Sequence, residues 1–173
     1  MFPWFNAAQG QILKVETLQH YDEGQNQSFQ AFLSGEKDKA RSLLWAAKSE
    51  DRALYSDISS RCVEFLRCRP VVFPMSDYMR WEIENYKVVE ELGERVYLCN
   101  HISVSELMNS IIQNDFMAFD LRAAFIHDYD KAGRLVGGWE VSVSEDILNL
   151  HALFFSLKTM SKPLRCFIDV LSS

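Results

Sequence analysis

The sequence predicts a single α+β domain, in which helices pack on a mixed or mainly antiparallel β-sheet of about five to six strands. Hydrophobic residues make up 48% of the chain and aromatic residues 13%, which is enough material for one core. Helix-like segments alternate with short segments rich in β-branched and aromatic residues. Because no internal repeat, low-complexity tract or Pro/Gly/Ser-rich linker divides the 173 residues, one domain over 1–173 is the simplest organisation.

The first part of the chain predicts one strand, several helices and a second strand. Residues 12–17 (ILKVET) alternate apolar and polar side chains over the length of a strand. A short helix is expected at 28–36 (SFQAFLSGE), because its aromatic residues recur on one helical face. Residues 36–60 are rich in Ala, Leu, Lys, Arg and Glu, which suits one long helix or two shorter ones. Residues 69–73 (RPVVF) predict a strand that ends at Pro74.

The clearest predicted helix begins after Ser76, a favourable N-cap residue, and ends before Gly93. One side of this helix carries charged residues at helical spacing: Arg80, Glu84, Lys87 and Glu91. The opposite side is apolar: Met79, Ile83, Tyr86 and Val89. Between the two sides lies a polar edge formed by Tyr78, Glu82 and Asn85. This edge is expected either to reach solvent or to face a pocket.

The second half of the chain predicts more strands and two further helices. Strands are expected at 95–99 (RVYLC) and 116–120 (FMAFD). Between them, 104–113 (VSELMNSIIQ) predicts a helix with Ser103 or Ser105 as its cap. Residues 123–143 predict a hairpin whose turn lies at 130–133, where Gly133 suits a positive φ.

The last predicted helix begins at Ser144, ends before Pro163 and is apolar on almost every side. Such a helix needs cover, and two alternatives supply it. In the first alternative, the chain forms a homodimer through Leu150, Leu153, Phe154 and Leu157. Alternatively, these four residues and Leu148 belong to the core, and the tail at 164–171 (LRCFIDVL) covers the rest of the helix. We favour the second alternative and keep the homodimer as a possible partner interaction.

Charge and hydropathy exclude two classes of partner. The formal net charge is −6, and the Lys and Arg residues of 37–52 alternate with Asp and Glu, so no basic surface for nucleic acid is expected. No apolar run approaches the roughly 20 residues that span a bilayer. The N-terminal residues also lack the pattern of a signal peptide. We therefore expect a cytoplasmic protein without a membrane segment.

The sequence contains none of the short motifs that announce a cofactor or a metal. Glycine-rich phosphate loops, HExxH, GxSxG and CxxCH are all missing. The four cysteines form no CxxC pair and have no histidine at ligand spacing, so we expect buried thiols and no metal site. No cofactor is predicted.

Five polar residues remain as candidates for a pocket. Glu16, Glu82 and Asp120 are carboxylates on three separate predicted elements, and two carboxylates that converge can act as acid and base. Tyr78 and Arg80 would orient a ligand from the same helix as Glu82. The alternatives are a solvent-facing strand residue for Glu16, surface positions for Glu82 and Arg80, and a turn residue for Asp120.

Several blocks of the sequence resemble one family. These blocks are LKVETLQHYD, FQAFLSGE, RPVVFPMSDYMRWEIENY, FMAFD and HDYDKAGRLVGGWEV. Together they resemble the uncharacterised bacterial family numbered 6879 in the domain-of-unknown-function series, which is typical of actinobacteria. The resemblance covers roughly residues 12–164, and the segment RSLLWAAKSEDRALYSDISSRCVEF and the apolar tail depart from the family pattern. It implies no catalytic residue or cofactor, and the frequent proximity of such proteins to helix-turn-helix regulators implies a regulatory or defence-linked role.

Two functions follow as hypotheses. The first is a non-enzymatic domain that binds a small ligand or a protein partner, which fits the acidic surface and the missing catalytic motifs. The second is an enzyme that acts on a small polar substrate through a carboxylate acid or base.

Overall fold

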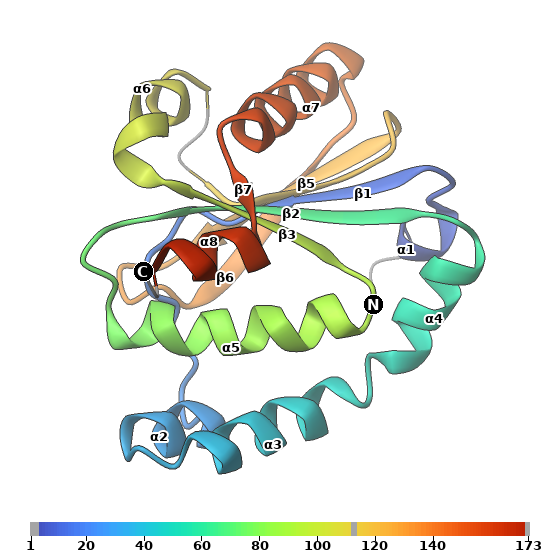
Figure 1. Cartoon of the computed structure of the whole chain (residues 1–173). Helices are drawn as coiled ribbons and strands as arrows, with labels where there is room; N and C mark the ends of the chain where they lie inside the picture. Colours follow the sequence, from blue (N-terminus) through green and yellow to red (C-terminus); the bar gives the residue numbers. More distant parts are fainter. Residues whose placement is uncertain (1–3, 112–113, 172–173) are drawn as a thin grey trace.

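A computed structural model describes residues 4–111 and 114–171 of the chain. Within them, seven strands form one sheet with the order β6-β5-β4-β1-β2-β3-β7 (Figure 1). The strands are β1 Gln11–Val15, β2 Glu64–Val71, β3 Arg95–Asn100, β4 Phe116–Phe119, β5 Ala123–Tyr129, β6 Leu135–Val141 and β7 Lys162–Pro163. The helices are α1 Trp4–Ala7, α2 Gln27–Leu33, α3 Lys37–Lys48, α4 Arg52–Ser60, α5 Asp77–Glu91, α6 His101–Ile111, α7 Ser144–Thr159 and α8 Leu164–Leu171. The predicted α+β class is confirmed, and the sheet is mixed.

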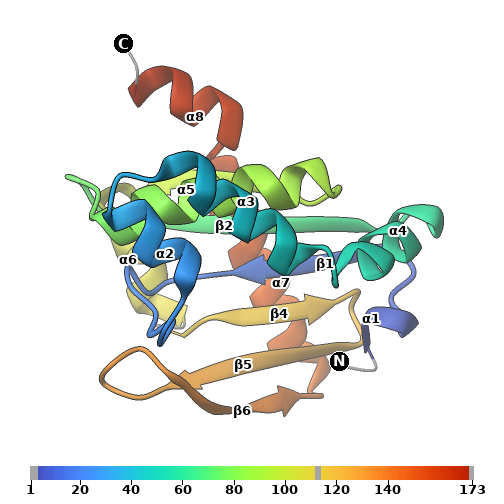
Figure 2. The ribbon, with the colours of Figure 1, turned by 90° about the horizontal axis from the view of Figure 1, so that it is seen from below.

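Helices cover both faces of the sheet. Figure 1 shows α4, α5 and α8 on one face and α6 and α7 on the other. Each face has its own hydrophobic core. A further layer, made by α2 and α3, packs on the outside of α5 through residues such as Leu44 and Trp81 (Figure 2). Helix α5 therefore lies between the sheet and α3, which explains why few of its residues reach solvent.

The alternation of β1 and β2 assigns side chains to the two faces. Ile12 packs in the core beneath α5, whereas Leu13 and Val15 pack in the core beneath α7. In β2, Leu66 and Cys68 belong to the α7 side. Their neighbours Arg67 and Arg69 therefore point to the α5 side, where both are buried. Two arginines thus occupy positions that a plain core would fill with apolar residues.

Strands β1, β2 and β3 run parallel, and the other neighbouring pairs in the sheet are antiparallel. The carboxyl ends of β1 and β2 therefore lie at the same edge of the sheet. The backbone N–H of Glu16, directly after β1, donates to the carbonyl oxygen of Cys68 at 3.2 Å. This pairing aligns the end of β1 with the second half of β2 and brings Glu16 over the sheet beneath α5.

Several predicted boundaries differ from the structure. Residues 36–60 form two helices, which is one of the two alternatives. The strand expected at 69–73 begins at Glu64 and ends at Val71, so Pro70 lies inside it. Pairing with β1 stops at Cys68, and the Gln19 side chain then donates to the Pro70 carbonyl at 2.9 Å and accepts from Val72 N–H at 2.8 Å. Proline is tolerated there because, on the β1 side of residue 70, the neighbour is the Gln19 side chain and not a paired strand.

The helix expected at 104–113 begins three residues earlier, at His101. Its cap is Asn100, whose side-chain oxygen accepts from the Ile102 N–H at 3.0 Å, and not Ser103 or Ser105. Residues 112–113 of that prediction lie outside the described residues. The hairpin prediction is confirmed, because β5 and β6 pair antiparallel and Gly133 in the turn has φ +84°. The pairing shifts register between Asp128, which lies opposite Gly137, and Tyr129.

The predicted cover for the last helix is wrong. Helix α7 packs on the sheet through Leu150, Leu153, Phe154 and Leu157, which are at most 2% exposed. The tail forms α8 on the opposite face and cannot cover α7 (Figure 1). Leu148 is 53% exposed rather than part of the core. Because the four residues named for a homodimer are already buried in their own chain, a dimer would need other residues, and the homodimer itself stays a prediction.

Candidate functional site

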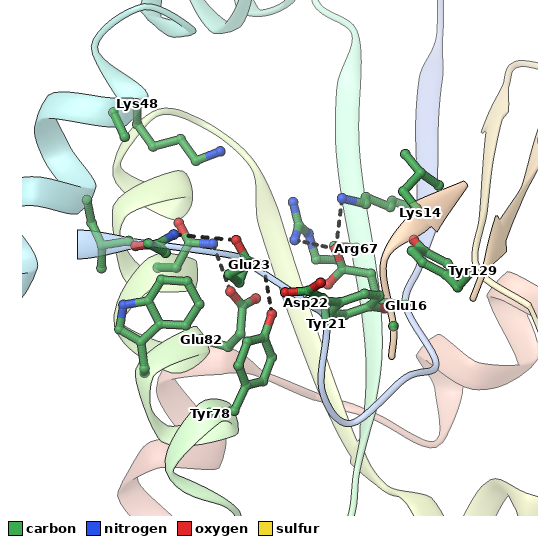
Figure 3. Close-up of a pocket in the computed structure, with 17 residues that line it drawn as sticks. Lys14, Glu16, Tyr21, Asp22, Glu23, Lys48, Arg67, Tyr78, Glu82 and Tyr129 are labelled. Atoms are coloured by element: carbon green, nitrogen blue, oxygen red, sulfur yellow. Dashed lines mark hydrogen bonds and ion pairs between the residues drawn. The ribbon is translucent and has the colours of Figure 1, made fainter. Parts of the chain in front are cut away.

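A cavity of about 390 Å³ opens at the edge of the sheet where β1 and β2 end (Figure 3). Its walls come from the start of α5, the end of α3, the loop after β1 and the turn between β5 and β6. The lining is mainly polar and aromatic, and its chemically distinctive members are Lys14, Glu16, Tyr21, Asp22, Glu23, Lys48, Arg67, Tyr78, Trp81, Glu82, Asn85 and Tyr129. This location of the cavity is typical, because ligand sites commonly lie at the carboxyl ends of parallel strands.

Arg67 is the centre of a buried ion network below the cavity. Its Nη1 donates to Glu16 Oε1 at 2.9 Å, and its Nε donates to Glu94 Oε1 at 2.5 Å. The Tyr55 hydroxyl donates to the same Glu94 carboxylate at 2.9 Å. The guanidinium also lies over the ring of Tyr86. Each buried charge in the network therefore has an opposite charge and hydrogen bonds.

Glu16 is held from three directions. Lys14 Nζ lies 2.8 Å from Oε1, Arg67 contacts the same oxygen, and the Tyr86 hydroxyl donates to Oε2 at 2.7 Å. Burial alone would raise the pKa of Glu16, but the charges of Arg67, Lys14 and Arg69 hold it well below the usual value of 4.5. Glu16 is thus an ionised structural anion, and its oxygens are occupied by protein groups.

A second network extends from Arg69 toward β4 and β5. Arg69 Nη1 donates to the Tyr21 hydroxyl oxygen at 2.8 Å, and the Tyr21 hydroxyl donates to Asp115. The Tyr129 hydroxyl donates to Asp115 Oδ2 at 2.9 Å, and the backbone N–H of Thr17 donates to Oδ1 at 2.7 Å. Arg69 is fully buried, and its Nε and Nη2 have no hydrogen-bond partner among the described residues. This network anchors the loop after β1 to the sheet.

Glu82 has a different environment. It lies on α5, lines the cavity and is only 5% exposed, and no Lys or Arg of the described residues forms an ion pair with it. Its one described hydrogen bond is from Asn85 Nδ2, at 3.4 Å. Burial, together with the charge of Glu16, raises the pKa of Glu82 to about 7. Near neutral pH this side chain is therefore present in both its protonated and its ionised form.

Aromatic residues form the wall beside Glu82. The Tyr78 hydroxyl donates to Glu23 Oε1 at 3.0 Å, and the Trp81 indole donates to Ser28 Oγ at 2.9 Å. The Tyr78 and Trp81 rings lie 5.5 Å apart between their centroids. Figure 3 shows the carboxylates of Glu23 and Glu82 near the Tyr78 hydroxyl. The wall therefore combines π faces with two carboxylates.

Contacts with the β5–β6 turn hold the loop that closes the cavity. The Asp22 backbone N–H donates to the Gly133 carbonyl at 3.1 Å, and Arg134 Nη2 donates to Asp22 Oδ2 at 2.9 Å. A Cβ on Gly133 would lie 2.8 Å from the backbone oxygen of His20. Glycine is needed there both for its positive φ and for this close approach.

The structure brings together three of the five predicted site residues. Glu16, Tyr78 and Glu82 line the cavity, so the polar edge of α5 faces a pocket and not bulk solvent. Arg80 is exposed, and its Nε donates to the Met75 carbonyl at 3.4 Å. Asp120 accepts from the backbone N–H groups of Gln9, Gly10 and Gln11 at 2.8 to 2.9 Å. Neither Arg80 nor Asp120 lines the cavity. Asp120 instead stabilises a turn, which is the alternative role expected for it from the sequence.

Sequence reasoning missed the basic and tyrosine residues of the cavity, Lys14, Tyr21, Arg67 and Tyr129, and the buried Arg69 and Asp115 that hold Tyr21. One signal was available. Residues 65–71 (FLRCRPV) place two arginines at alternate positions of an otherwise apolar strand, and buried arginines need acidic partners. The remaining members were not recognisable, because their neighbours along the chain differ from their neighbours in space.

Among the described residues, no cluster of three or more His, Cys, Asp or Glu side chains has an arrangement suited to a metal ion. The expectation of buried thiols holds for Cys68 and Cys99, whereas Cys62 and Cys166 are exposed. Burial raises the pKa of Cys68, so that thiol is unreactive.

Fold and site together define a single α+β domain with a polar cavity over a mixed sheet. The chain belongs to the family described as "Domain of unknown function (DUF6879)", whose profile matches residues 2–169. The resemblance drawn from the sequence blocks is thereby confirmed. Comparisons with curated proteins and with solved structures found no match. Within the described part of the chain, no helix has the length and apolar character needed to cross a membrane.

Proposed function

We propose that this domain binds a small polar ligand in the cavity beside Glu82. The observation that carries the proposal is a buried carboxylate that lines a cavity and lacks a basic partner among the described residues. A buried ionisable group is normally paired, and an unpaired one in a cleft marks a candidate site. The volume of about 390 Å³ lies within the range typical of small-molecule pockets.

The surroundings of the cavity support binding without catalysis. Glu16 and Arg67 are engaged by other protein groups, which makes them a rigid floor and not reactive groups. The loop closing the cavity is attached to the β5–β6 turn through Asp22 and Arg134. A rigid floor and an anchored loop lower the entropy lost when a ligand binds. A cytoplasmic location and a regulatory or defence-linked setting are part of this proposal, and the latter rests on the family resemblance alone.

An enzyme is the second candidate, and one observation favours it. A carboxyl group whose pKa is about 7 is well suited to take up and release a proton at neutral pH, and Glu82 has this property inside a cavity. The Tyr78 hydroxyl, which lines the same cavity, would orient the substrate. Under this alternative Glu82 is the acid or base, and Asp120, which caps a turn elsewhere, is not.

Two-dimensional NMR of the ¹⁵N-labelled protein with mixtures of cationic, neutral and anionic metabolites tests the proposal. Ligand binding is expected to shift the resonances of the loop after β1 and of the first half of α5. Glu82→Gln is expected to weaken that binding, whereas Glu84→Gln is the matched control on the same helix, because Glu84 pairs with Lys87 away from the cavity. Shifts confined to other surfaces, or none with any mixture, would reject the cavity as a ligand site. Turnover of a bound compound would favour the enzyme.

A further inference from the structure

We propose that the ligand of this cavity is a small organic cation, whose primary ammonium or guanidinium group is held by Glu82, Glu23 and the amide oxygen of Asn85. This inference rests on the proposed ligand-binding function and specifies the chemical class of the ligand. A cation is favoured because some carboxylates of the lining have a basic partner within the protein, whereas others have none among the described residues, where one buried amide oxygen also lacks a donor.

Two of the four lining carboxylates are neutralised by the protein. Glu16 contacts Lys14 and Arg67, and Asp22 contacts Arg134. The other two, Glu23 and Glu82, have no Lys or Arg partner within the described residues. The donors to Glu23 in the described part of the chain are neutral groups, the Tyr78 hydroxyl at 3.0 Å and Asn26 Nδ2 at 3.4 Å. The uncompensated charge of the cavity is therefore negative and lies on the wall formed by Glu23 and Glu82.

Asn85 supplies an independent observation. Its Nδ2 donates to Glu82 Oε1, which orients the amide and leaves Oδ1 as the free acceptor. That oxygen is buried and has no donor among the described residues. A buried acceptor without a donor is destabilising, so a donor from a ligand is favourable there. Asn85 and Glu82 line the same cavity, and an ammonium or guanidinium group carries enough N–H donors to serve both.

The basic lining residues argue against an anionic ligand. Lys14 and Arg67 are engaged by Glu16, and Lys48 Nζ lies 3.4 Å from Asp51. An anion would have to compete with one of these carboxylates for its cation. A cation instead meets the rings of Tyr78 and Trp81, which line the cavity and offer π faces for cation–π contact.

The charged groups around Glu82 link cation binding to pH. Glu16, directly after β1, and Glu23 on the following loop disfavour its ionised form, and Arg69 and Arg67 on β2 favour it. With a pKa of about 7, Glu82 is mostly protonated at pH 6 and mostly ionised at pH 8. A cation binds the ionised form. Since the apparent affinity scales with the competent fraction, it is expected to be about tenfold weaker at pH 6 than at pH 8.

Isothermal titration calorimetry with probes of similar length tests the class of ligand. The probes are putrescine and agmatine as cations, 1,4-butanediol as the neutral analogue and succinate as the anion. The expected result is binding of a cation to the 173-residue protein, tighter at pH 8, with no heat of binding from butanediol or succinate. Glu82→Gln is expected to weaken cation binding at least tenfold and to remove its pH dependence, whereas Glu84→Gln leaves both unchanged. Far-ultraviolet circular dichroism of each variant verifies that it is folded.

The other outcomes separate this inference from the proposed function. Binding of succinate or butanediol in the cavity without binding of either cation overturns the cationic class and leaves the ligand-binding function standing. Cation binding that Glu82→Gln does not weaken also overturns the inference, because the cation then binds elsewhere. If neither cation binds, the inference is wrong, and if the metabolite mixtures also leave the NMR spectrum unchanged, the proposed function is wrong as well.

Discussion

Arg67 and Glu16 form a buried ion pair, with Nη1 and Oε1 2.9 Å apart, on the face of the sheet that α5 covers. Arg67 lies on β2 and Glu16 directly follows β1, two strands whose residues are mostly apolar, and both side chains are 8% exposed. Arg67 also holds Glu94, so one cation serves two carboxylates from different elements. The pair forms the floor of the cavity and links the integrity of the fold to that of the candidate site.

Loss of Arg67 should be strongly destabilising. Arg67→Met keeps most of the side-chain volume but leaves Glu16 and Glu94 buried without the guanidinium that neutralises both. The expected loss is about 3–5 kcal/mol of the free energy of unfolding, measured by urea denaturation. The control is Arg95→Met, which breaks the exposed pair with Glu64 and should cost at most about 1 kcal/mol. Equal losses in the two variants would contradict the central role of Arg67.

Glu82 should make the fold less stable as the pH rises. Its pKa is about 7 in the folded chain against an ordinary 4.5, so the folded state binds one proton more than the unfolded state between these values. The contribution of Glu82 is therefore present below pH 4.5 and is lost as the pH rises through about 7, by up to about 1.4 kcal/mol per pH unit.

Glu82→Gln removes this titration. The free energy of unfolding of the variant, measured by urea denaturation, should exceed that of the wild type by more at pH 8 than at pH 5. Taking the difference between the two proteins cancels the titration of the groups that do not interact with Glu82. Glu84→Gln, on the same helix, should show a pH-independent difference from the wild type. A difference for Glu82→Gln that shrinks toward pH 8 would show that Glu82 is paired in the folded chain.

Asp120 should matter for stability and not for ligand binding. Burial alone would raise its pKa, but the three backbone N–H donors of Gln9, Gly10 and Gln11 bring it below the usual 3.8. Asp120→Ala should cost about 1–3 kcal/mol at pH 7. The contribution should fade as the pH falls below 3.8, which urea denaturation at several pH values measures. Ligand affinity should be unchanged, and a tenfold loss would place Asp120 in the site after all.

Gly133 should be the most sensitive glycine of the loop region. Gly133→Ala combines a positive φ of +84° with a Cβ that would lie 2.8 Å from the His20 carbonyl oxygen. Gly35→Ala is the matched control, because its φ is +81° but no atom lies within 4 Å of the added Cβ. The control should cost about 1 kcal/mol from backbone strain alone, and Gly133→Ala distinctly more. Thermal unfolding followed by circular dichroism measures both, and equal losses would argue against a tight contact between loop and turn.

Local signals in the sequence predicted elements whose stability is itself local. The helix after Ser76 was predicted from its cap and its periodicity, and the Ser76 side chain does accept from the Met79 N–H at 3.1 Å. The turn at Gly133 was predicted from its need for a positive φ. The cover of the last helix was predicted wrongly, because the sequence does not say on which face of the sheet the tail returns. The polar edge of Tyr78, Glu82 and Asn85 was recognised, but its two possible environments were not distinguishable.

The sequence by itself determined the α+β class, the family and most of the elements, because these depend on periodicity, caps and turns among near neighbours. Only the tertiary structure decided which polar residues share the cavity. Glu16 meets Arg67 across 51 positions of the chain, and Tyr21 meets Asp115 across 94. Such contacts depend on strand order and register, which place β2 beside β1 on one side and β4 on the other. Whether a carboxylate of the described residues forms an ion pair, as Glu16 does, or lines the cavity without one, as Glu82 does, therefore depends on where the sheet and α5 bring the arginines.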